Sequence, residues 1–218
     1  MNEEVLEIQE QPVAARVIAK IISVIFHPLF IPTYIFFWLL WRFPAEFAGI
    51  TPMQLFARKF GVFWMTGFFP AFSVFLLWRL KFIESIQLKT QRERIAPYII
   101  TMIFYWWMWY LSRNFTDQPA VLKFFYFGIF LCTVFGLIIN SFQKISLHAM
   151  GAGGAVACAI LTSLYCHVFL GGDIAFITIA AGLTCTARLY AGSHNNNEIY
   201  LGFLVGVLCQ LMGYAAMM

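Results

Sequence analysis

Charged side chains are scarce in this sequence. Only 11% of its 218 residues are Asp, Glu, Lys or Arg, whereas 61% are hydrophobic, and the mean hydropathy is +0.79. Soluble domains carry about 25% charged and about 45–50% apolar residues, so this composition excludes a water-soluble monomer, a disordered chain, a coiled coil and a nucleic-acid-binding domain. The formal net charge of +4 is not gathered in a basic stripe or tail, which also argues against a nucleic-acid partner.

Paired cysteine motifs are also missing. The five cysteines lie far apart in apolar stretches, with no C-x-x-C spacing, at positions Cys132, Cys158, Cys166, Cys185 and Cys209. Buried cysteine behaves as a small hydrophobic residue. The sequence therefore predicts neither a disulfide framework nor a thiolate metal site.

The first residues, MNEEVLEIQEQP, lack the basic start of a signal peptide. We expect residues 1–16 to form a short polar segment, with the first apolar stretch serving as the insertion signal. No internal repeat or linker divides the chain, so residues 1–218 are predicted to form a single transmembrane domain.

Long apolar stretches dominate the rest of the chain. About 20 residues are needed to cross a bilayer as a helix, and no alternating strand pattern of a membrane barrel is present. The sequence predicts an all-α, polytopic transmembrane helix bundle with six or seven spans, because two of the stretches (98–111 and 174–187) are short. His27, Pro28 and Pro32 predict a break within the first stretch. The stretches are 17–41, 60–80, 98–111, 121–139, 149–170, 174–187 and 199–217.

Three polar segments separate these stretches: residues 89–97, 144–148 and 188–198. Two spans lie between the first and second segments, and two more lie between the second and third. An even number of crossings returns the chain to the same membrane face. We therefore expect the three segments to meet at one end of the bundle, where charged residues at a membrane edge indicate a functional site.

The third segment carries the most specific spacing. His194 and Glu198 are four residues apart, so on a helix the carboxylate can fix the tautomer of the imidazole. Arg188 can bind a phosphate through its planar guanidinium. Ser146 and His148 stand at the start of a predicted helix, where the helix N-terminus favours an anion.

These residues resemble the type 2 phosphatidic acid phosphatase superfamily of integral membrane lipid phosphatases. That family carries the motifs Lys-x6-Arg-Pro, Pro-Ser-Gly-His and Ser-Arg-x5-His-x3-Asp. In this chain they read, in order, Lys89-x6-Ala96-Pro97, Ile145-Ser146-Leu147-His148 and Ala187-Arg188-x5-His194-x3-Glu198. The resemblance covers residues 89–198 and does not extend to the first two spans.

The resemblance implies a phosphohistidine mechanism without a metal or other cofactor. His194 would be the nucleophile, oriented by Glu198, and His148 the general acid. The residues implied or considered as phosphate ligands are Lys89, Ser146 and Arg188, with Arg94 in place of the arginine missing at position 96 and Lys144 as an extra contact. The substrate would be a phosphorylated lipid of the bilayer, such as phosphatidic acid, phosphatidylglycerophosphate, a polyprenyl diphosphate or lipid A phosphate. By analogy, the site would face the periplasm from a bacterial inner membrane.

Two other functions fit the same residues. The chain could transfer the phosphoryl group to another lipid instead of water, or it could be a non-catalytic phospholipid-binding or carrier protein. His27 and His167 are interpreted as interfacial residues without a role in the site, and Arg79 and Lys81 as part of a solvated loop.

Overall fold

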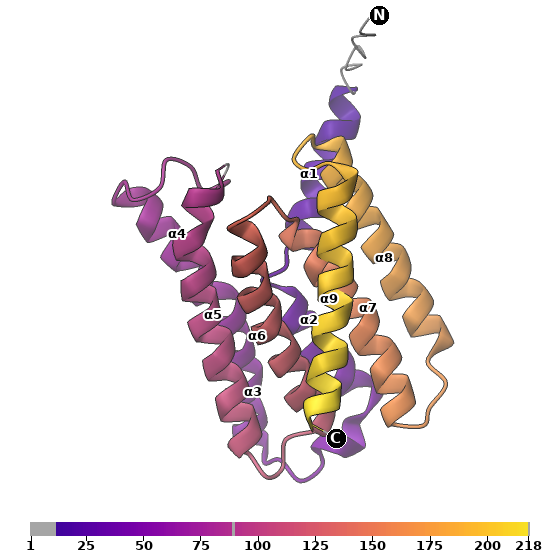
Figure 1. Cartoon of the computed structure of the whole chain (residues 1–218). Coiled ribbons are helices and arrows are strands. Elements are labelled where there is room, and N and C mark those ends of the chain that lie inside the picture. The colour runs from indigo at the N-terminus through magenta and orange to yellow at the C-terminus, as the bar shows by residue number, and fades with distance from the viewer. Residues whose placement is uncertain (1–11, 89, 218) are drawn as a thin grey trace, which may run out of the picture.

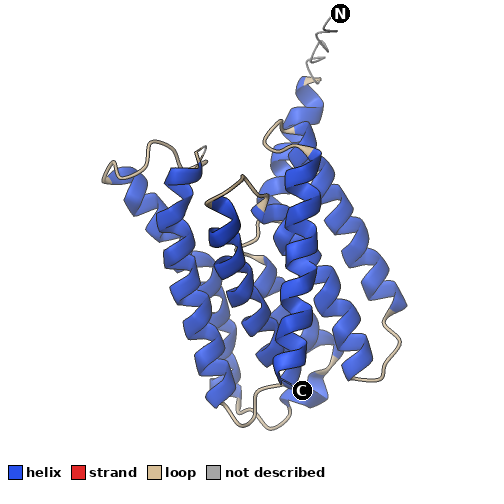
Figure 2. Ribbon diagram, viewed as in Figure 1, coloured by secondary structure: helices blue, strands red, loops and turns tan. Residues whose placement is uncertain are grey.

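The computed structural model describes residues 12–88 and 90–217, and within these ranges it contains helices and no strand (Figure 2). This confirms the predicted all-α class. Lys89, a predicted phosphate ligand, and residues 1–11 of the predicted polar segment lie outside the described residues. The helices are α1 (Val13–Ile25), α2 (Ile31–Arg42), η1 (Pro44–Phe47), α3 (Pro52–Phe63), η2 (Trp64–Phe68), α4 (Phe69–Arg79), α5 (Gln91–Asn114), α6 (Ala120–Asn140), α7 (Leu147–Tyr165), α8 (Gly171–Tyr190) and α9 (Asn196–Met217).

Five helices in the described part of the chain are long and apolar enough to cross a membrane. One of them is the continuous helix Pro52–Arg79, formed by α3, η2 and α4, and the others are α6, α7, α8 and α9. Their outer faces expose large apolar side chains, as contact with lipid requires. These features are those of an integral membrane protein.

The first apolar stretch is broken where the sequence predicted. α1 ends at Ile25 and α2 begins at Ile31, with Pro28 in the bend and Pro32 in the first turn of α2. The two short helices pack on different partners, since α1 lies mainly against α8 while α2 packs against α3 and α7. The break therefore brings His27 to the inside of the bundle.

The main hydrophobic core fills one half of the bundle. Phe36 of α2, together with Leu122 and Tyr126 from the first half of α6, is fully buried in this cluster. This half contains the end of α2 and the start of α6. The opposite half, where α5, α7 and α9 begin, holds the described parts of the three polar segments, at the upper end of the bundle in Figure 1. The described parts of the three polar segments therefore lie at one end of the bundle, as the sequence predicted.

Small residues bring α7 and α9 close together. A Cβ atom on Gly202 of α9 would lie 2.6 Å from the backbone oxygen of Ser146, so only glycine fits this approach. The backbone N–H of Ser146 also donates to the carbonyl of Glu198, at 3.2 Å. The beginnings of α7 and α9 are thus held side by side, with His148 in the first turn of α7 and His194 just before α9.

Candidate active site

A cavity of about 1030 Å³ lies at the end of the bundle that carries the polar segments. It is lined by residues of α1, α2 and the bend between them, of α4 to α9, and of the loops that precede α5, α7 and α9. Most of the described residues that the sequence singled out are in its wall: Arg94, Lys144, His148, Arg188 and His194. Residues more than 90 positions apart in the sequence therefore share one cavity.

His194 is held by the turn between α8 and α9. α8 closes with hydrogen bonds from Gly192 N–H to the Leu189 carbonyl and from Ser193 N–H to the Arg188 carbonyl. This C-terminal motif needs a left-handed residue, and Gly192 supplies it with φ +61°. The chain then turns sharply into α9, so that His194 comes into the wall of the cavity next to Arg188.

The predicted pairing of His194 with Glu198 is present. The Nδ1 atom of His194 lies 2.5 Å from Oε2 of Glu198, and the His194 side chain is 5% exposed. Because a carboxylate oxygen accepts, Nδ1 carries the proton, and Nε2 of the neutral ring keeps a lone pair. Glu198 itself is outside the lining of the cavity, behind the imidazole that it orients.

The charge state of His194 suits a nucleophile. The pKa of His194 is lowered to about 4, mainly by burial and in part by the nearby cations Arg188 and Lys144. The Glu198 carboxylate acts in the opposite direction, but burial has the larger effect. At neutral pH the ring is therefore uncharged, and its free nitrogen can form a bond to an electrophile.

His148 stands in the first turn of α7. Its Nε2 atom lies 3.0 Å from the backbone carbonyl oxygen of Ser23 in α1. A carbonyl only accepts, so the Nε2 of His148 carries a proton that is directed toward α1. The ring of His27 meets the ring of His148 edge to face, with 5.1 Å between centroids.

The cations of the cavity have mainly neutral partners. Arg188 donates to the Ser23 hydroxyl at 3.4 Å, and its buried Nε has no hydrogen-bond partner among the described residues. Arg94 donates to the carbonyls of Leu88 and Ile145, at 2.9 and 3.4 Å. No Asp or Glu is among the described residues that line the cavity. Such a wall attracts an anion.

Lys144 is a cation of this wall that lies near a carboxylate. Its Nζ donates to the Ser193 carbonyl at 2.6 Å and lies 4.0 Å from Oε2 of Glu198. This lysine therefore ties the loop before α7 to the turn that carries His194. It can neutralise part of the charge on a bound anion at the same time.

The structure places Ser146, an implied phosphate ligand, outside the lining of the cavity. It is fully buried, and its hydroxyl accepts from the Ala149 N–H at 3.4 Å as the N-cap of α7. It is not among the residues that line the cavity. The hydroxyl serves the backbone because the first N–H groups of a helix have no partner within it.

Three residues of α1 and the bend after it were missed by the sequence analysis: Lys20, Ser23 and His27 line the cavity. His27, interpreted from the sequence as an interfacial residue, lies in the wall of the cavity with its ring against that of His148. The sequence contained a signal for a shared face, because these residues recur every three or four positions along a segment that is otherwise almost entirely apolar.

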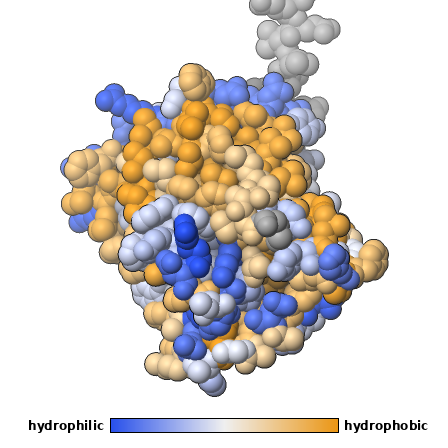
Figure 3. Space-filling view, turned by 60° about the horizontal axis from the view of Figure 1, so that its bottom comes forward, coloured by the Kyte–Doolittle hydropathy of each residue, from blue (hydrophilic) through white to orange (hydrophobic). Residues whose placement is uncertain are grey.

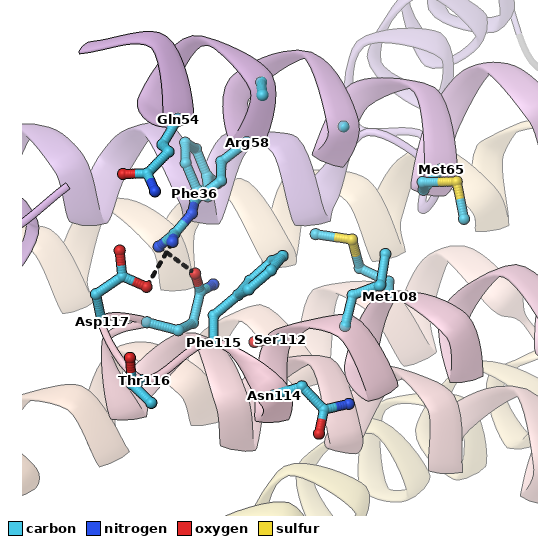
Figure 4. Close-up of a pocket in the computed structure, with 14 residues that line it drawn as sticks. Phe36, Gln54, Arg58, Met65, Met108, Ser112, Asn114, Phe115, Thr116 and Asp117 are labelled. Carbon is cyan, nitrogen blue, oxygen red and sulfur yellow. Dashed lines mark hydrogen bonds and ion pairs between the residues drawn. The ribbon is translucent and has the colours of Figure 1, made fainter. Parts of the chain in front are cut away.

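A second cavity, of about 460 Å³, lies at the opposite end of the bundle (Figure 4). There Arg58 of α3 forms an ion pair with Asp117 at 2.6 Å and donates to the Gln118 side chain at 2.9 Å. Its guanidinium also lies over the ring of Phe115, at 4.8 Å. Figure 3, turned toward this end, shows hydrophilic residues gathered there beside a hydrophobic flank.

The first cavity thus combines a neutral imidazole fixed by a carboxylate, a second imidazole that presents an N–H, and several cations. These groups can supply a nucleophile, a general acid and stabilisation of negative charge. The chain matches no family model, no curated protein and no solved structure.

Proposed function

We propose that the protein is a membrane lipid phosphatase that acts through a phosphohistidine on His194. One observation carries the proposal: His194, paired with Glu198, shares a cavity with His148 and with cations that have mainly neutral partners. A phosphate group is the anion that matches both the nucleophile and the cations. Because the cavity lies at the end of a bundle of apolar helices, a lipid headgroup can enter it while the acyl or prenyl chain stays among the helices or in the bilayer.

The reaction follows from the tautomers of the two imidazoles. The Nε2 lone pair of His194 attacks phosphorus, and the bond between phosphorus and the lipid oxygen breaks. His148 acts in its protonated, imidazolium form: it gives its Nε2 proton to that oxygen and becomes neutral, so the lipid leaves as a neutral alcohol or a lower phosphate ester. Water then hydrolyses the phosphohistidine and returns the proton to His148. The Glu198 carboxylate stabilises the positive imidazole of the intermediate.

The motif spacing supports the same chemistry. The arginine that the resemblance requires at position 96 is replaced by alanine, but Arg94 lines the cavity from the first turn of α5. Arg94 and Arg188 therefore provide two guanidinium groups in one cavity, which are suited to the oxygens of a phosphoryl group in the transition state.

We propose seven spans for the protein in its membrane. The 24 residues of α5 are long enough to cross at about 1.5 Å per residue, and the broken pair α1 and α2 would form another crossing. This count adds two crossings to the five helices described above. By analogy with the resembled family, the site faces the periplasm from a bacterial inner membrane; labelling of Ser193→Cys by an impermeant reagent on intact cells tests this orientation.

The decisive experiment measures phosphate release from purified protein and trapping of the intermediate. We expect phosphate release from lipid phosphates in the presence of a metal chelator, loss of this activity in His194→Ala, and unchanged activity in His167→Ala, which alters a histidine outside the cavity lining. Protein incubated with a labelled lipid phosphate and quenched in alkaline detergent, where phosphohistidine is stable, should carry the label on His194. Release by His194→Ala at the wild-type rate, or binding of the lipid without turnover, would contradict the proposal.

A further inference from the structure

The inner face of α1 carries a stripe of polar residues. Lys20 and Ser23 of α1 and His27 in the bend after it follow one another at helical spacing, and all three line the cavity. Nothing in the resembled motifs involves this helix, because they begin at residue 89. The stripe forms the wall of the cavity that faces His148.

The hydrogen bond of His148 shows on which side the leaving group lies. Its Nε2–H is directed at the Ser23 carbonyl, 3.0 Å away. A general acid must direct this proton at the leaving oxygen, which then takes the place of the Ser23 carbonyl as the acceptor. Whatever is attached to the leaving oxygen therefore lies against α1.

The charges along this wall indicate what the leaving group carries. One phosphoryl group has a charge of about −1.5 to −2 at neutral pH, which Arg94, Lys144 and Arg188 already balance. Lys20 adds a fourth cation on α1, about one helical turn (about 5.4 Å) from Ser23, and the described part of the cavity wall offers no carboxylate to it. A fourth cation beside the leaving group is suited to a second phosphate.

We propose that Lys20, Ser23 and His27 bind the second phosphoryl group of a lipid diphosphate, from which the site removes the terminal phosphate. This inference rests on the proposed phosphatase function. His194 bonds to the terminal phosphorus, and the bond from that phosphorus to the bridging oxygen breaks. The bridging oxygen takes the Nε2 proton of His148 in its imidazolium form, and the lipid monophosphate leaves along α1. Water then releases inorganic phosphate from His194.

The test compares two substrates that share one chain, farnesyl diphosphate and farnesyl monophosphate. We expect the wild type to prefer the diphosphate, with inorganic phosphate and farnesyl monophosphate formed in equal amounts. In Lys20→Met, kcat/KM for the diphosphate should fall about tenfold more than for the monophosphate, since a hydrogen bond to a charged group is lost. The matched control is Arg16→Met, one turn further out on α1 and outside the cavity lining, which should leave the ratio unchanged.

The outcomes separate the two proposals. Equal loss on both substrates in Lys20→Met, or a wild-type preference for the monophosphate, would overturn the α1 subsite and leave the phosphatase function intact. Absence of release from either substrate, and from phosphatidic acid, by the wild type would overturn the phosphatase function. His27→Gln is a second variant of the same subsite, and the same selective loss is expected from it.

Discussion

The arginines at the two ends of the helix bundle have different partners. At the end away from the large cavity, Arg58 pairs with Asp117 at 2.6 Å, and Arg42 pairs with Asp173 at 3.1 Å. At the cavity end, the described contacts of Arg188 are with a serine hydroxyl, and those of Arg94 are with backbone carbonyls.

This difference separates arginines that stabilise the fold from arginines that can bind an anion. An arginine paired with a carboxylate has its charge balanced within the protein, so Arg58 and Arg42 join α3 and α2 to the loop before α6 and to the start of α8. Arginines with neutral partners keep most of their attraction for an anion. Holding such charges close together is unfavourable in the free protein, and a bound phosphate relieves this cost.

Glu198 is the exception at the cavity end, because this carboxylate bonds an imidazole. Replacing it by Gln should lower kcat about a thousandfold, since the amide can favour the wrong tautomer of His194. Glu198→Asp should keep part of the activity. The carboxylate raises the pKa of His194, so its loss should lower that pKa further, and the acid limb of the kcat profile should move to lower pH.

The measurement is a pH–rate profile of phosphate release for the wild type and both variants. The wild-type rate should decline only as the pH approaches about 4, where His194 becomes protonated. A Gln variant with wild-type kcat, or an acid limb that moves to higher pH, would show that Glu198 does not act on His194.

The comparison of the two ends is tested most directly by a pair of matched substitutions. Arg188→Gln should lower kcat/KM about a hundredfold, because one charged donor to the phosphoryl oxygens is lost, while the melting temperature should hardly change. Arg58→Gln should leave kcat/KM within twofold and reduce the free energy of unfolding by about 1 kcal/mol, the usual scale for a partly exposed ion pair.

Both variants are compared by phosphate release and by thermal unfolding in detergent. The two ends would not differ in the way proposed if Arg58→Gln lost activity to the same extent, or if Arg188→Gln lost stability without losing activity. Added inorganic phosphate should raise the melting temperature of the wild type, and it should raise that of Arg188→Gln by less.

Much of the fold could be predicted because it depends on local patterns. The apolar stretches predicted the helices, and the prolines predicted the break between α1 and α2. The start of α5 was placed too late, at residue 98, although Thr90 and Glu93 form a capping box whose pattern is visible in the sequence. This shift matters for the site, because it puts Arg94 on a helix that faces the cavity.

The site could be predicted only where a short spacing in the sequence decides contact. His194 and Glu198 are such a pair. The packing of His27 on His148 joins residues 121 positions apart through the bend after α1, and no local pattern encodes it. Ser146 shows a different limit, since a serine before a helix can bind a ligand or cap the helix, and the sequence alone does not distinguish the two.

Among the substitutions near the large cavity, Ser146→Ala gives the smallest expected effect on activity, and it tests the cap. Loss of an N-cap hydroxyl costs about 1 kcal/mol, so the variant should unfold at a lower temperature by a few degrees, with kcat/KM within about threefold of the wild type. Ser146→Thr or Asp, which can cap the helix, should recover part of the stability where the larger side chain fits. A phosphate ligand at this position would instead give a loss of at least tenfold in kcat/KM with little change in stability, and that result would move Ser146 from the helix cap to the phosphate site.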